Sequence, residues 1–406
     1  MGRDRTSPRA APDSPPAILA INGGSSSIKF AVFAPGPAPA RLVSGQVERI
    51  GQGQASLVAT RDGAQPVRRP IDASDHTRAA ESLVDWLRAE GRVASLAGIG
   101  HRIVQGGIRL REHQPITPAV VAELKRNQPL DLAHLPREIA LIEVLERRMP
   151  GVLQVACFDT AFHRNLPRVA QTLPIPRSYA DAGVRRLGFH GLSYEYLSGE
   201  LRRTAGDAVA DGRLILAHLG SGASLAAVAR GAPVDTTMAF TPNSGLVMGT
   251  RPGDLDPGLL VYLMREERLT AEGLDDFISN RCGLLGVSET TSDMQDLLAR
   301  RASDPRAAEA VALFCYAIQK GIGAFAAVLG GLDTLVFSGG IGEHAAEVRR
   351  MVCDGLQLLD VRLDEQRNSE DAGVISAATS AVGVRVIATD EEIVIARTVQ
   401  KFLEGR

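Results

Sequence analysis

The 406-residue chain is short of several features that would point to common functional classes. Aromatic residues make up only 4%, with a single Trp, so the cores must be built from Ala, Val, Leu and Ile. The 45 Lys and Arg residues nearly balance the 47 Asp and Glu residues, which gives no general attraction to nucleic acids or acidic membranes. No uncharged apolar run reaches the roughly 18 residues of a membrane-spanning helix. We therefore expect neither a nucleic acid nor a membrane as a partner.

Cysteine usage excludes two further classes. The four cysteines, Cys157, Cys282, Cys315 and Cys353, form no C-x-x-C pair, so neither a zinc site nor a redox motif is indicated. Scattered cysteines in apolar surroundings are typical of reduced thiols, and we expect a cytoplasmic protein.

The N-terminal stretch MGRDRTSPRAAPDSPP lacks the apolar segment of a secretory signal. We predict that residues 1–15 form a disordered extension.

Two segments have the pattern of a β-hairpin with a Gly/Ser tip. In the first, apolar strands at 17–22 and 28–33 flank the tip GGSSS. In the second, strands at 214–219 and 225–229 flank the tip GSGAS. The two hairpins lie about 200 residues apart, which indicates a duplicated domain.

A third glycine turn, at 338–343, follows the apolar strand 334–337 and opens a helix. This arrangement presents backbone N–H groups to a nucleotide. A long apolar helix is predicted at 306–330, and a helix capped by Ser74 at 74–90. Because strands and helices mix throughout, the fold class is α/β.

The three glycine turns favour binding of phosphate or nucleotide, because glycine exposes the backbone N–H groups that hold phosphate. The P-loop pattern G-x-x-x-x-G-K-[ST] is absent from the sequence, which excludes that class of enzyme. Phosphoryl transfer also needs cations and carboxylates. Candidates at strand ends and glycine-rich bends are Arg102, Asp159, His190, Arg251 and Glu391. Each taken singly is more often structural, so composition and spacing alone predict a nucleotide-binding α/β enzyme.

Eight motifs in order give the chain a close resemblance to the acetate kinase family over nearly its whole length. They are INGGSSSIKF at 21–30, GHRIVQGG at 100–107, FDTAFH at 158–163, RRLGFHG at 185–191, HLGSGAS at 218–224, FTPNSGLVMGTRPGDLDPG at 240–258, FSGGIGEH at 337–344 and TDEE at 389–392. The resemblance implies the fold of acetate and sugar kinases, Hsp70 and actin: two duplicated ribonuclease-H-like domains with a cleft between them. The expected N-terminal domain comprises residues 16–158 plus 393–406, and the expected C-terminal nucleotide-binding and dimerisation domain comprises residues 159–392.

The resemblance also implies roles for matching residues. The implied catalytic set is Asp159, Arg102, Arg251 and His190: the arginines hold the acid's carboxylate and the transferring phosphoryl group, the histidine hydrogen-bonds the phosphoryl oxygens, and the aspartate orients the acceptor or the metal. The acid is bound by Arg102, Val104, Ala133, Phe189 and Pro242. Mg²⁺, with Mn²⁺ as an alternative, is held by Glu391 and, through water, by Asn22. The nucleotide is bound by Ser25, Ser27, Lys29, His218, Gly220, Ser221, Gly222, Asp293, Gly339, Gly340, Ile341, Gly342 and His344.

Several positions depart from the family's pattern and leave the catalytic set intact. Ser221 replaces Asn, Tyr194 replaces His, Asn243-Ser244 replaces Leu-Glu, Gln295 replaces Arg, His344 replaces Asn and Asp390 replaces Asn. The changes on the nucleotide side bear on the choice of base. Ala133 stands where the family usually has Leu, and the smaller side chain widens the acid pocket. We therefore expect kcat/KM for propionate within about tenfold of that for acetate.

The leading hypothesis is a Mg²⁺-dependent acetate kinase that transfers the γ-phosphate of ATP directly and reversibly to acetate, giving acetyl phosphate and ADP. A propionate or butyrate kinase of the same family is one alternative. A non-catalytic ATP-binding module of the actin type is another. The arginines and His190 favour an enzyme, because a nucleotide clamp needs no cations at an acceptor site. The resemblance further implies a homodimer.

Overall fold

The computed structural model describes residues 16–24, 26–61, 63–132 and 134–405. The predicted N-terminal extension, Ser25 and Ala133 lie outside the described residues. The chain divides into two compact units: the first ends at Phe158 and resumes at Glu391, and the second comprises Asp159–Asp390. The prediction placed residues 391 and 392 in the second domain. The structure assigns them to the first unit, because they begin a helix that packs on the first sheet.

The first unit contains an eight-stranded sheet in the order β5-β4-β3-β2-β1-β6-β8-β7. Its strands are β1 (Ala17–Gly23), β2 (Ser27–Ala34), β3 (Ala40–Glu48), β4 (Ser56–Arg61), β5 (Val67–Pro70), β6 (Leu96–Ile103), β7 (Gln114–Pro115) and β8 (Leu153–Phe158). The pairs β1–β2 and β2–β3 are antiparallel, whereas β6 runs parallel to both β1 and β8. The predicted first hairpin is β1–β2, and the sheet continues beyond it through β3, β4 and β5.

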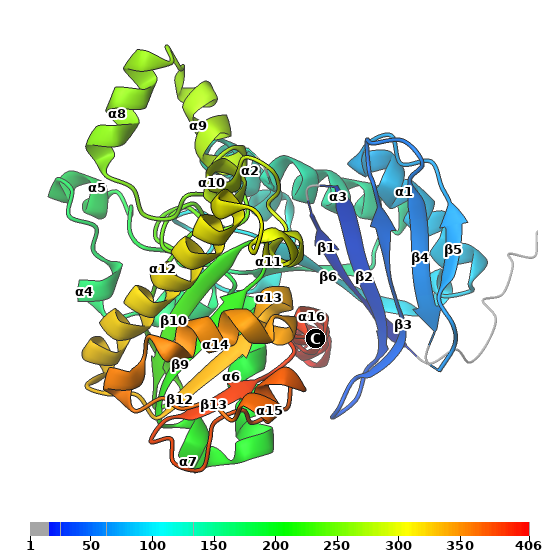
Figure 1. Ribbon diagram of the computed structural model, residues 1–406. Coiled ribbons are helices and arrows are strands. Elements are labelled where there is room, and N and C mark those ends of the chain that lie inside the picture. Colours follow the sequence, from blue (N-terminus) through cyan, green and yellow to red (C-terminus); the bar gives the residue numbers. More distant parts are fainter. Residues whose placement is uncertain (1–15, 25, 62, 133, 406) are drawn as a thin grey trace, which may run out of the picture. The chain divides into compact units, whose positions relative to one another are not determined.

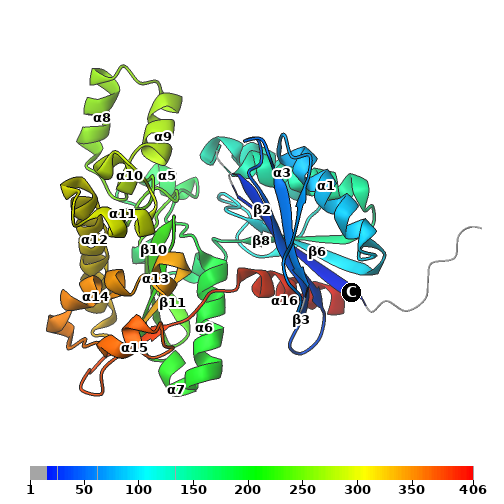
Figure 2. The same ribbon diagram turned by 45° about the vertical axis from the view of Figure 1, so that its right-hand side comes forward.

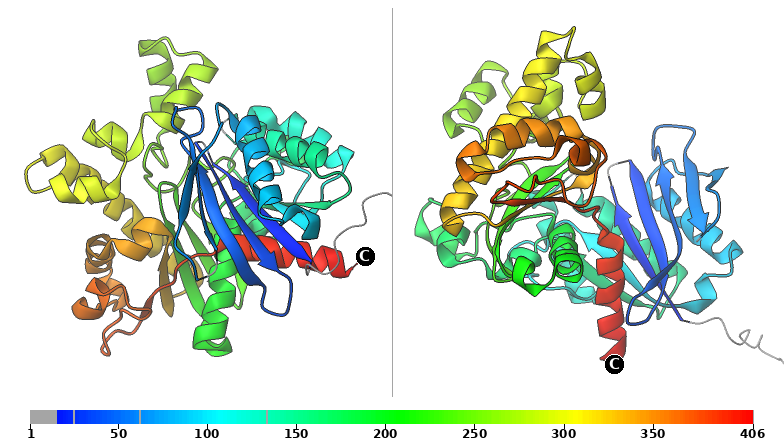
Figure 3. Two further views of the ribbon diagram at one scale, coloured as in Figure 1. Left: turned by 90° about the vertical axis from the view of Figure 1, so that its right-hand side faces the viewer. Right: turned by 60° about the horizontal axis from the view of Figure 1, so that its bottom comes forward.

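Successive side chains along each strand point to opposite faces of this sheet, and helices cover both faces. The helical segments are α1 (His76–Ala89), η1 (Val93–Ser95), α2 (Pro118–Asn127), η2 (Gln128–Leu130), α3 (Leu135–Arg148) and α16 (Glu391–Glu404). Leu19 and Ile99 belong to the core formed with α1 and α3. Gly100, next to Ile99, faces α16, and a Cβ added there would lie 2.2 Å from Ile395 Cγ2. Figures 2 and 3 show α16 running along this second face.

The start of α1 differs from the prediction. Ser74 was expected to cap the helix, but the cap is Asp75, whose side chain accepts a hydrogen bond from the Arg78 N–H at 2.8 Å. Ser, Asp and Asn are all good N-cap residues, and the sequence offers two of them in succession. The capping residue depends on which side chain reaches the third helical N–H, and here it is the aspartate.

The second unit contains a five-stranded sheet in the order β11-β10-β9-β12-β13. Its strands are β9 (Arg213–Leu219), β10 (Ala223–Ala229), β11 (Ala232–Thr236), β12 (Thr334–Ser338) and β13 (Gly383–Val386). Two antiparallel pairs are followed by two parallel pairs, which is the pattern of β3-β2-β1-β6-β8 in the first unit. The repeated topology confirms the duplicated α/β fold predicted from the two Gly/Ser hairpins.

The second sheet also carries helices on both faces (Figure 1). The helical segments are η3 (Phe162–Asn165), α4 (Arg168–Gln171), α5 (Arg177–Asp181), α6 (Gly191–Ala205), α7 (Asp207–Ala210), α8 (Pro257–Glu266), α9 (Ala271–Asn280), α10 (Gly283–Ser288), α11 (Met294–Arg300), α12 (Pro305–Leu329), α13 (Gly339–His344), α14 (Ala346–Asp354), η4 (Gln357–Leu359) and α15 (Glu365–Ser369). Tyr194 and Leu197 of α6 pack with Leu216 and Ala226 of the sheet. Leu225 points the other way and packs on α12.

Helix α12 is long and apolar enough to cross a membrane by length and composition alone, although 39% of its most apolar window is buried within the protein. A core helix meets the same criterion, and α12 packs against β10, α10, α11 and α14. Arg306, Glu309 and Lys320 interrupt its apolar sequence. The predicted stop is close to the observed end, because Gly330 adopts the left-handed conformation, with φ of 69°, immediately after the last helical residue.

Candidate active site

The first unit brings together three predicted residues at the ends of β1 and β6 and at the start of α16. Because β1 and β6 are parallel neighbours, Asn22 and Arg102 near their C-terminal ends reach the same edge of the sheet. Asn22 Oδ1 accepts a hydrogen bond from Arg102 Nη1 at 3.2 Å. Asn22 Nδ2 donates to Glu391 Oε2 at 3.4 Å. The structure thus connects the predicted substrate-side cation to the two predicted metal-side groups.

The close packing of α16 on β6 explains how a residue at the end of the chain joins this group. Gly98 and Gly100 leave room for Val399 and Ile395, and a side chain at either glycine would push the helix away. Glu391 is the first residue of α16, so the position of its carboxylate depends on this contact. The glycines of β6 are therefore part of the construction of the site.

The acid-side residue Val104 is buried just beyond β6. Its backbone N–H lies 3.1 Å and 3.2 Å from the two carboxylate oxygens of Glu138 on α3, which is itself buried. A carboxylate that accepts a backbone N–H fixes the loop that follows the strand. Glu138 was not singled out from the sequence, where it is one acidic residue among several in a helix. Ala133, predicted to line the same pocket, lies outside the described residues.

The tip of the first hairpin is closed by a hydrogen bond from the Gly24 N–H to the Ser27 carbonyl oxygen at 2.8 Å. His76 Nε2 bonds the Gly24 carbonyl oxygen at 2.9 Å. Lys29 stands opposite Asn22 in the β1–β2 pair and is exposed. The predicted phosphate-side residues Ser27 and Lys29 thus share one hairpin, whereas Ser25 lies outside the described residues.

In the second unit, a tight turn holds His190 immediately before α6. His190 adopts the left-handed conformation, with φ of 57° and ψ of 25°, which is uncommon outside glycine and is characteristic of functional sites. The Gly191 N–H donates to the carbonyl oxygen of Asp159 at 2.9 Å, so the predicted Asp159, which is buried, begins the unit beside this turn. Phe189 is buried too, and its carbonyl oxygen bonds His163 Nε2 at 3.2 Å.

The second hairpin tip brings two of the predicted catalytic side chains together. A Cβ placed on Gly222 would lie 2.6 Å from Arg251 Nη2 and 3.2 Å from His190 Nε2. Arg251 is held from behind by a hydrogen bond from its Nη1 to the Pro242 carbonyl oxygen at 2.7 Å. The Gly249 N–H donates to the Ser221 carbonyl oxygen at 2.9 Å, and this bond connects the loop that carries Arg251 to the hairpin. Glycine at position 222 is therefore what allows both side chains to approach the backbone of the tip.

His218 lies behind His190, with ring centroids 4.3 Å apart. Its Nδ1 bonds Ser193 Oγ at 2.8 Å, and the same hydroxyl lies 2.9 Å from Thr389 Oγ1. Thr389 begins the TDEE motif, so the hairpin is linked to the segment that leads into Glu391. This link was not predicted, because the three residues come from distant parts of the sequence.

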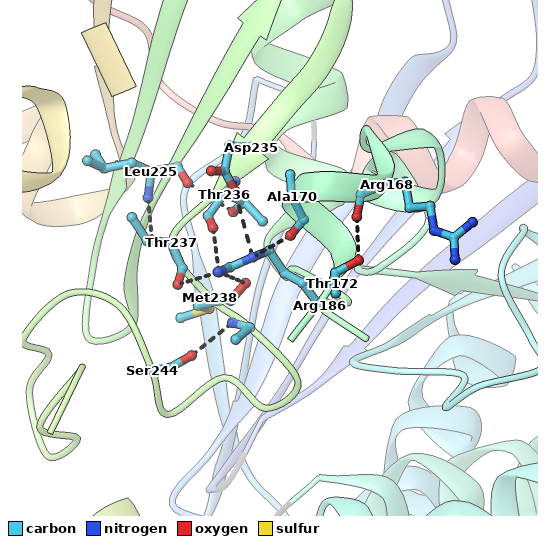
Figure 4. A network of polar contacts seen from close by, with 11 residues as sticks. Arg168, Ala170, Thr172, Arg186, Leu225, Asp235, Thr236, Thr237, Met238 and Ser244 are labelled. Atoms are coloured by element: carbon cyan, nitrogen blue, oxygen red, sulfur yellow. Dashed lines mark hydrogen bonds and ion pairs between the residues drawn. The ribbon is translucent and has the colours of Figure 1, made fainter. Parts of the chain in front are cut away.

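Arg186 contacts Ala170 and the segment from Asp235 to Met238, as Figure 4 shows. Its Nε donates to the Ala170 carbonyl oxygen at 3.0 Å, and its Nη1 donates to the Thr236 carbonyl oxygen at 2.9 Å and to the Thr237 carbonyl oxygen at 3.3 Å. It also forms an ion pair of 3.7 Å with Asp235, whose pKa is raised by burial. The guanidinium thus joins the segment before His190 to the segment before the FTPNSG loop.

The third glycine turn places the predicted nucleotide-side residues directly against the second hairpin. Gly339 has φ of 75°, and a Cβ there would lie 2.7 Å from the Leu219 carbonyl oxygen. Glu343 accepts the backbone N–H of Gly339 at 2.8 Å and that of Thr389 at 3.1 Å. The turn from Gly339 to Gly342 is therefore held in place by a carboxylate that the sequence did not single out.

A fully buried arginine supports the end of this turn. Arg349 donates hydrogen bonds to the carbonyl oxygens of Gly342 and Glu343, both at 2.9 Å, and to Asn368 Oδ1 at 2.8 Å. It satisfies carbonyl groups that would otherwise be unpaired at the end of α13. Of the other predicted nucleotide contacts, Asp293 caps α11 through a hydrogen bond from the Asp296 N–H, and His344 is exposed.

Two buried histidines are structural. Burial lowers the pKa of His101 to about 4, and likewise that of His163 to about 4, so both are neutral at physiological pH. His101 Nε2 bonds Gln154 at 2.7 Å. Within the described residues, no cluster of three or more His, Cys, Asp or Glu side chains could hold a metal by protein ligands alone.

The two repeated α/β sheets are those of the acetate and sugar kinase fold. An arginine and a histidine converge on one Gly/Ser hairpin tip, an arrangement suited to binding phosphate. The particular family follows from comparison. The chain belongs to the acetokinase family, whose family model matches residues 17–397. It is therefore a kinase of this family.

Individual relatives carry two different names. An acetate kinase of Rhodopseudomonas palustris (strain TIE-1) is 43% identical over 394 residues, which cover 96% of this chain and 98% of the relative. A propionate kinase of Citrobacter rodentium is 40% identical over 390 residues, covering 95% of this chain and 96% of the relative. The crystal structure of Porphyromonas gingivalis acetate kinase has a TM-score of 0.84 and 35% identity, covering 96% of this chain and 100% of that chain.

Proposed function

We propose that this kinase transfers the γ-phosphate of ATP to the carboxylate of acetate or a close homologue, giving an acyl phosphate and ADP. The observation that carries the proposal is the convergence of Arg251 and His190 on the glycine tip at Gly222. Backbone N–H groups of a Gly/Ser tip bind phosphate, and a guanidinium and an imidazole beside it complement the charge on a transferring phosphoryl group. A non-catalytic ATP-binding module would have no use for that pair.

In the proposed reaction a carboxylate oxygen of the acid attacks the γ-phosphorus of ATP, and the bond from that phosphorus to the β-phosphate oxygen breaks as ADP leaves. Arg251 and His190 donate hydrogen bonds to the equatorial oxygens, where negative charge is spread in the transition state. Arg102 pairs with the acid's carboxylate, to which its planar guanidinium is matched. Asp159 orients the acceptor side. Positioning and charge neutralisation carry the rate, because little covalent chemistry is required of the protein.

Mg²⁺ fits the residues of the first unit. In phosphotransferases this ion keeps several waters and binds one or two carboxylates together with substrate phosphates, so a complete cage of protein ligands is not needed. Glu391 supplies a carboxylate and Asn22 a neighbouring amide oxygen, and the two side chains are already connected. We propose that they hold Mg²⁺, with Mn²⁺ as an alternative. When bound, the ion neutralises charge on the phosphates of ATP.

Removal of divalent cations with EDTA should abolish activity, and added Mg²⁺ should restore it; full activity in EDTA would contradict this assignment.

Acetate is the leading acid, and propionate is the second candidate. The relatives named acetate kinase and propionate kinase are nearly equally similar to this chain, at 43% and 40% identity. The Ala in place of Leu at position 133 favours an acid longer than acetate. Both acids would be bound by the same arginine and differ only in the apolar pocket.

We further propose that the chain forms a homodimer through the second unit. Helices α8 and α9 project from that unit and bury none of their residues (Figures 1 and 2). Val261 and Tyr262 of α8 and Tyr316 of α12 are large apolar side chains about half exposed. Large apolar residues exposed on a surface are typical of protein interfaces. Light scattering should give twice the chain mass, and Tyr262→Glu should lower it, whereas Val169→Glu, at an exposed site on α4, should not. A wild-type monomer at micromolar concentration would exclude the dimer.

The function is tested by trapping the acyl phosphate with hydroxylamine. Wild-type enzyme with ATP, Mg²⁺ and acetate should yield acetyl hydroxamate. Arg102→Ala and Arg251→Ala should each lower kcat/KM by about 10²-fold or more, because each removes a charged donor that faces the reacting groups. The exposed Arg69→Ala and Arg300→Ala are matched controls in the first and second units and should behave as wild type. Unchanged acyl phosphate formation in both site variants would disprove the assignment of the active site.

A further inference from the structure

A buried line of hydroxyl groups leads from α6 to His190. The hydroxyl oxygen of Tyr194 lies 2.5 Å from Ser224 Oγ on β10, and Ser224 Oγ lies 2.8 Å from His190 Nδ1. Tyr194 and Ser224 are both completely buried. The three residues come from the first turn of α6, the turn before it and the second hairpin, all within the second unit. Nothing in the reaction proposed above uses Tyr194 or Ser224.

The direction of these hydrogen bonds follows from counting protons. Burial raises the pKa of the Tyr194 phenol well above its ordinary value, so the group keeps its proton. Hydrogen bonds with Ser224 and with the backbone of His218 act in the opposite sense and are smaller than the effect of burial. The phenol has a single proton, and the Ser224 hydroxyl at 2.5 Å is a partner that can accept it.

Ser224 then has its own proton to donate, and His190 Nδ1 is the acceptor within reach. In the reverse arrangement Nδ1 would donate to Ser224 and Ser224 to Tyr194, whose own proton would have no acceptor among the partners in this line. A buried donor without an acceptor disfavours that arrangement by about tenfold or more. In the order Tyr194 O–H, Ser224 O–H, His190 Nδ1, each hydroxyl proton has an acceptor.

We propose that Tyr194 and Ser224 are positioning residues that hold His190 as its Nε2–H tautomer, so that this imidazole is a hydrogen-bond donor to the transferring phosphoryl group. The geometry agrees with this role, because Nε2 is the ring atom that faces Gly222 beside Arg251. The other tautomer would present a lone pair there, which repels a phosphoryl oxygen. The His218 ring, tilted by 32° and with its centroid 4.3 Å away, and the left-handed backbone of His190 keep the imidazole in this orientation.

This inference rests on the proposed phosphoryl transfer and assigns a role to a residue that departs from the pattern of related sequences. Tyr194 stands where the resemblance leads one to expect a histidine. Both side chains can donate a proton to Ser224, whereas Phe has the shape of Tyr without the donor. The chain therefore offers a graded series at one position: Tyr, His and Phe.

The first test compares variants in steady-state kinetics. Tyr194→Phe should lower kcat about five- to tenfold, and KM for ATP and acetate should change less than twofold, because the donor acts in the transition state rather than in binding. Ser224→Ala should lower kcat at least as much. Tyr194→His should recover activity to within about threefold of wild type. Tyr196→Phe, the same change two residues along α6, is the matched control and should leave kcat unchanged. Equal kcat for wild type, Tyr194→Phe and Ser224→Ala would refute the proposal.

The second test reads the tautomer itself and needs neither activity nor a variant with lowered stability. Nitrogen NMR of wild-type protein labelled at its eight histidines distinguishes a protonated from an unprotonated ring nitrogen, and His190→Asn identifies the signal of His190. The expected spectrum has an unprotonated Nδ1 and a protonated Nε2. A proton on Nδ1 would overturn the inference even if every variant were inactive. The expected tautomer in a protein that forms no acyl phosphate would instead overturn the proposed function and leave the hydrogen-bonded line intact.

Discussion

Gly222→Ala should damage catalysis without damaging the fold. A Cβ at this position would lie 2.6 Å from Arg251 Nη2, whereas ordinary contact begins near 3.4 Å. The backbone of Gly222 is not in the left-handed region, so alanine itself introduces no strain in φ. The contact is with the end of a flexible side chain, and the guanidinium therefore has to withdraw by about 1 Å. Misplacement of a catalytic group by that distance lowers the rate about 10²-fold.

Two features of the structure limit how Arg251 can adapt. Its Nη1 is bonded to the Pro242 carbonyl oxygen, and His190 Nε2 also lies only 3.2 Å from the added Cβ. If the guanidinium moves away from the methyl group, it loses either its hydrogen bond to Pro242 or its position beside His190. We expect kcat for acetyl phosphate formation to fall about 10²-fold, with a smaller rise in KM for ATP.

The matched comparison is Gly220→Ala at the other end of the same tip. There the added Cβ would meet its nearest atoms, the Gly222 carbonyl oxygen and His218 Nε2, at 3.4 Å and 3.8 Å, which are ordinary contacts. Its effect on kcat should be at least about tenfold smaller than that of Gly222→Ala, since no side chain has to move, and an effect on the predicted nucleotide site would appear in KM for ATP. Both variants are assayed by hydroxamate formation, with thermal unfolding to confirm the fold. Gly222→Ala with the kcat of Gly220→Ala would show that Arg251 and His190 do not act at this tip.

Three further predictions concern support, acid choice and pH. Arg349→Met should lower the free energy of unfolding by about 3 kcal/mol and raise KM for ATP more than it changes kcat, because the carbonyl groups of Gly342 and Glu343 at the end of α13 lose their donor; calorimetry measures the first effect and kinetics the second. Propionate should be used within about tenfold of acetate in kcat/KM, and Ala133→Leu should favour acetate; a hundredfold preference of wild type for acetate would contradict the wider pocket. The free energy of unfolding should fall as the pH is lowered from about 6.5 to 4, because the unfolded chain takes up protons that folded His101 and His163, with pKa values of about 4, do not; constant stability over this range in denaturant titrations would contradict it.

The repeated hairpins could be recognised in the sequence because each of their elements has a local signal. Alternating or continuous apolar residues mark the strands, and Gly/Ser runs mark the tips. The same signals are weak in β4 and β5, which carry Arg61, Arg68 and Arg69, and neither strand was predicted. β5 is an edge strand of the sheet and β4 lies next to it. Strands of this kind are stabilised by pairing with a neighbour more than by their own composition, so their presence depends on the sheet they join.

Some residues of the candidate site could likewise be selected from the sequence, and others could not. Arg102, His190 and Arg251 stand in distinctive glycine-rich motifs, and those motifs are enough to select them from the sequence. Glu343 and Arg349 could not be selected in this way, because their roles depend on bonds to main-chain groups of the folded turn. A buried arginine that satisfies carbonyl groups looks in sequence like any charged residue on a helix. Such residues become visible only when the backbone they support is known.

Knowing that residue 190 is a histidine does not say which of its ring nitrogens carries the proton, and Tyr194 bears on that choice. The motif GFHG supplies an imidazole at position 190, but an imidazole can present either a proton or a lone pair to a phosphoryl oxygen. That choice is made by Ser224 and Tyr194, which meet His190 only because β10 and the first turn of α6 pack together. Under this proposal, tyrosine at position 194 is compatible with an active enzyme because its hydroxyl donates a hydrogen bond to Ser224. By the same reasoning, a side chain of equal bulk without a donor would preserve the packing of α6 and lose the tautomer.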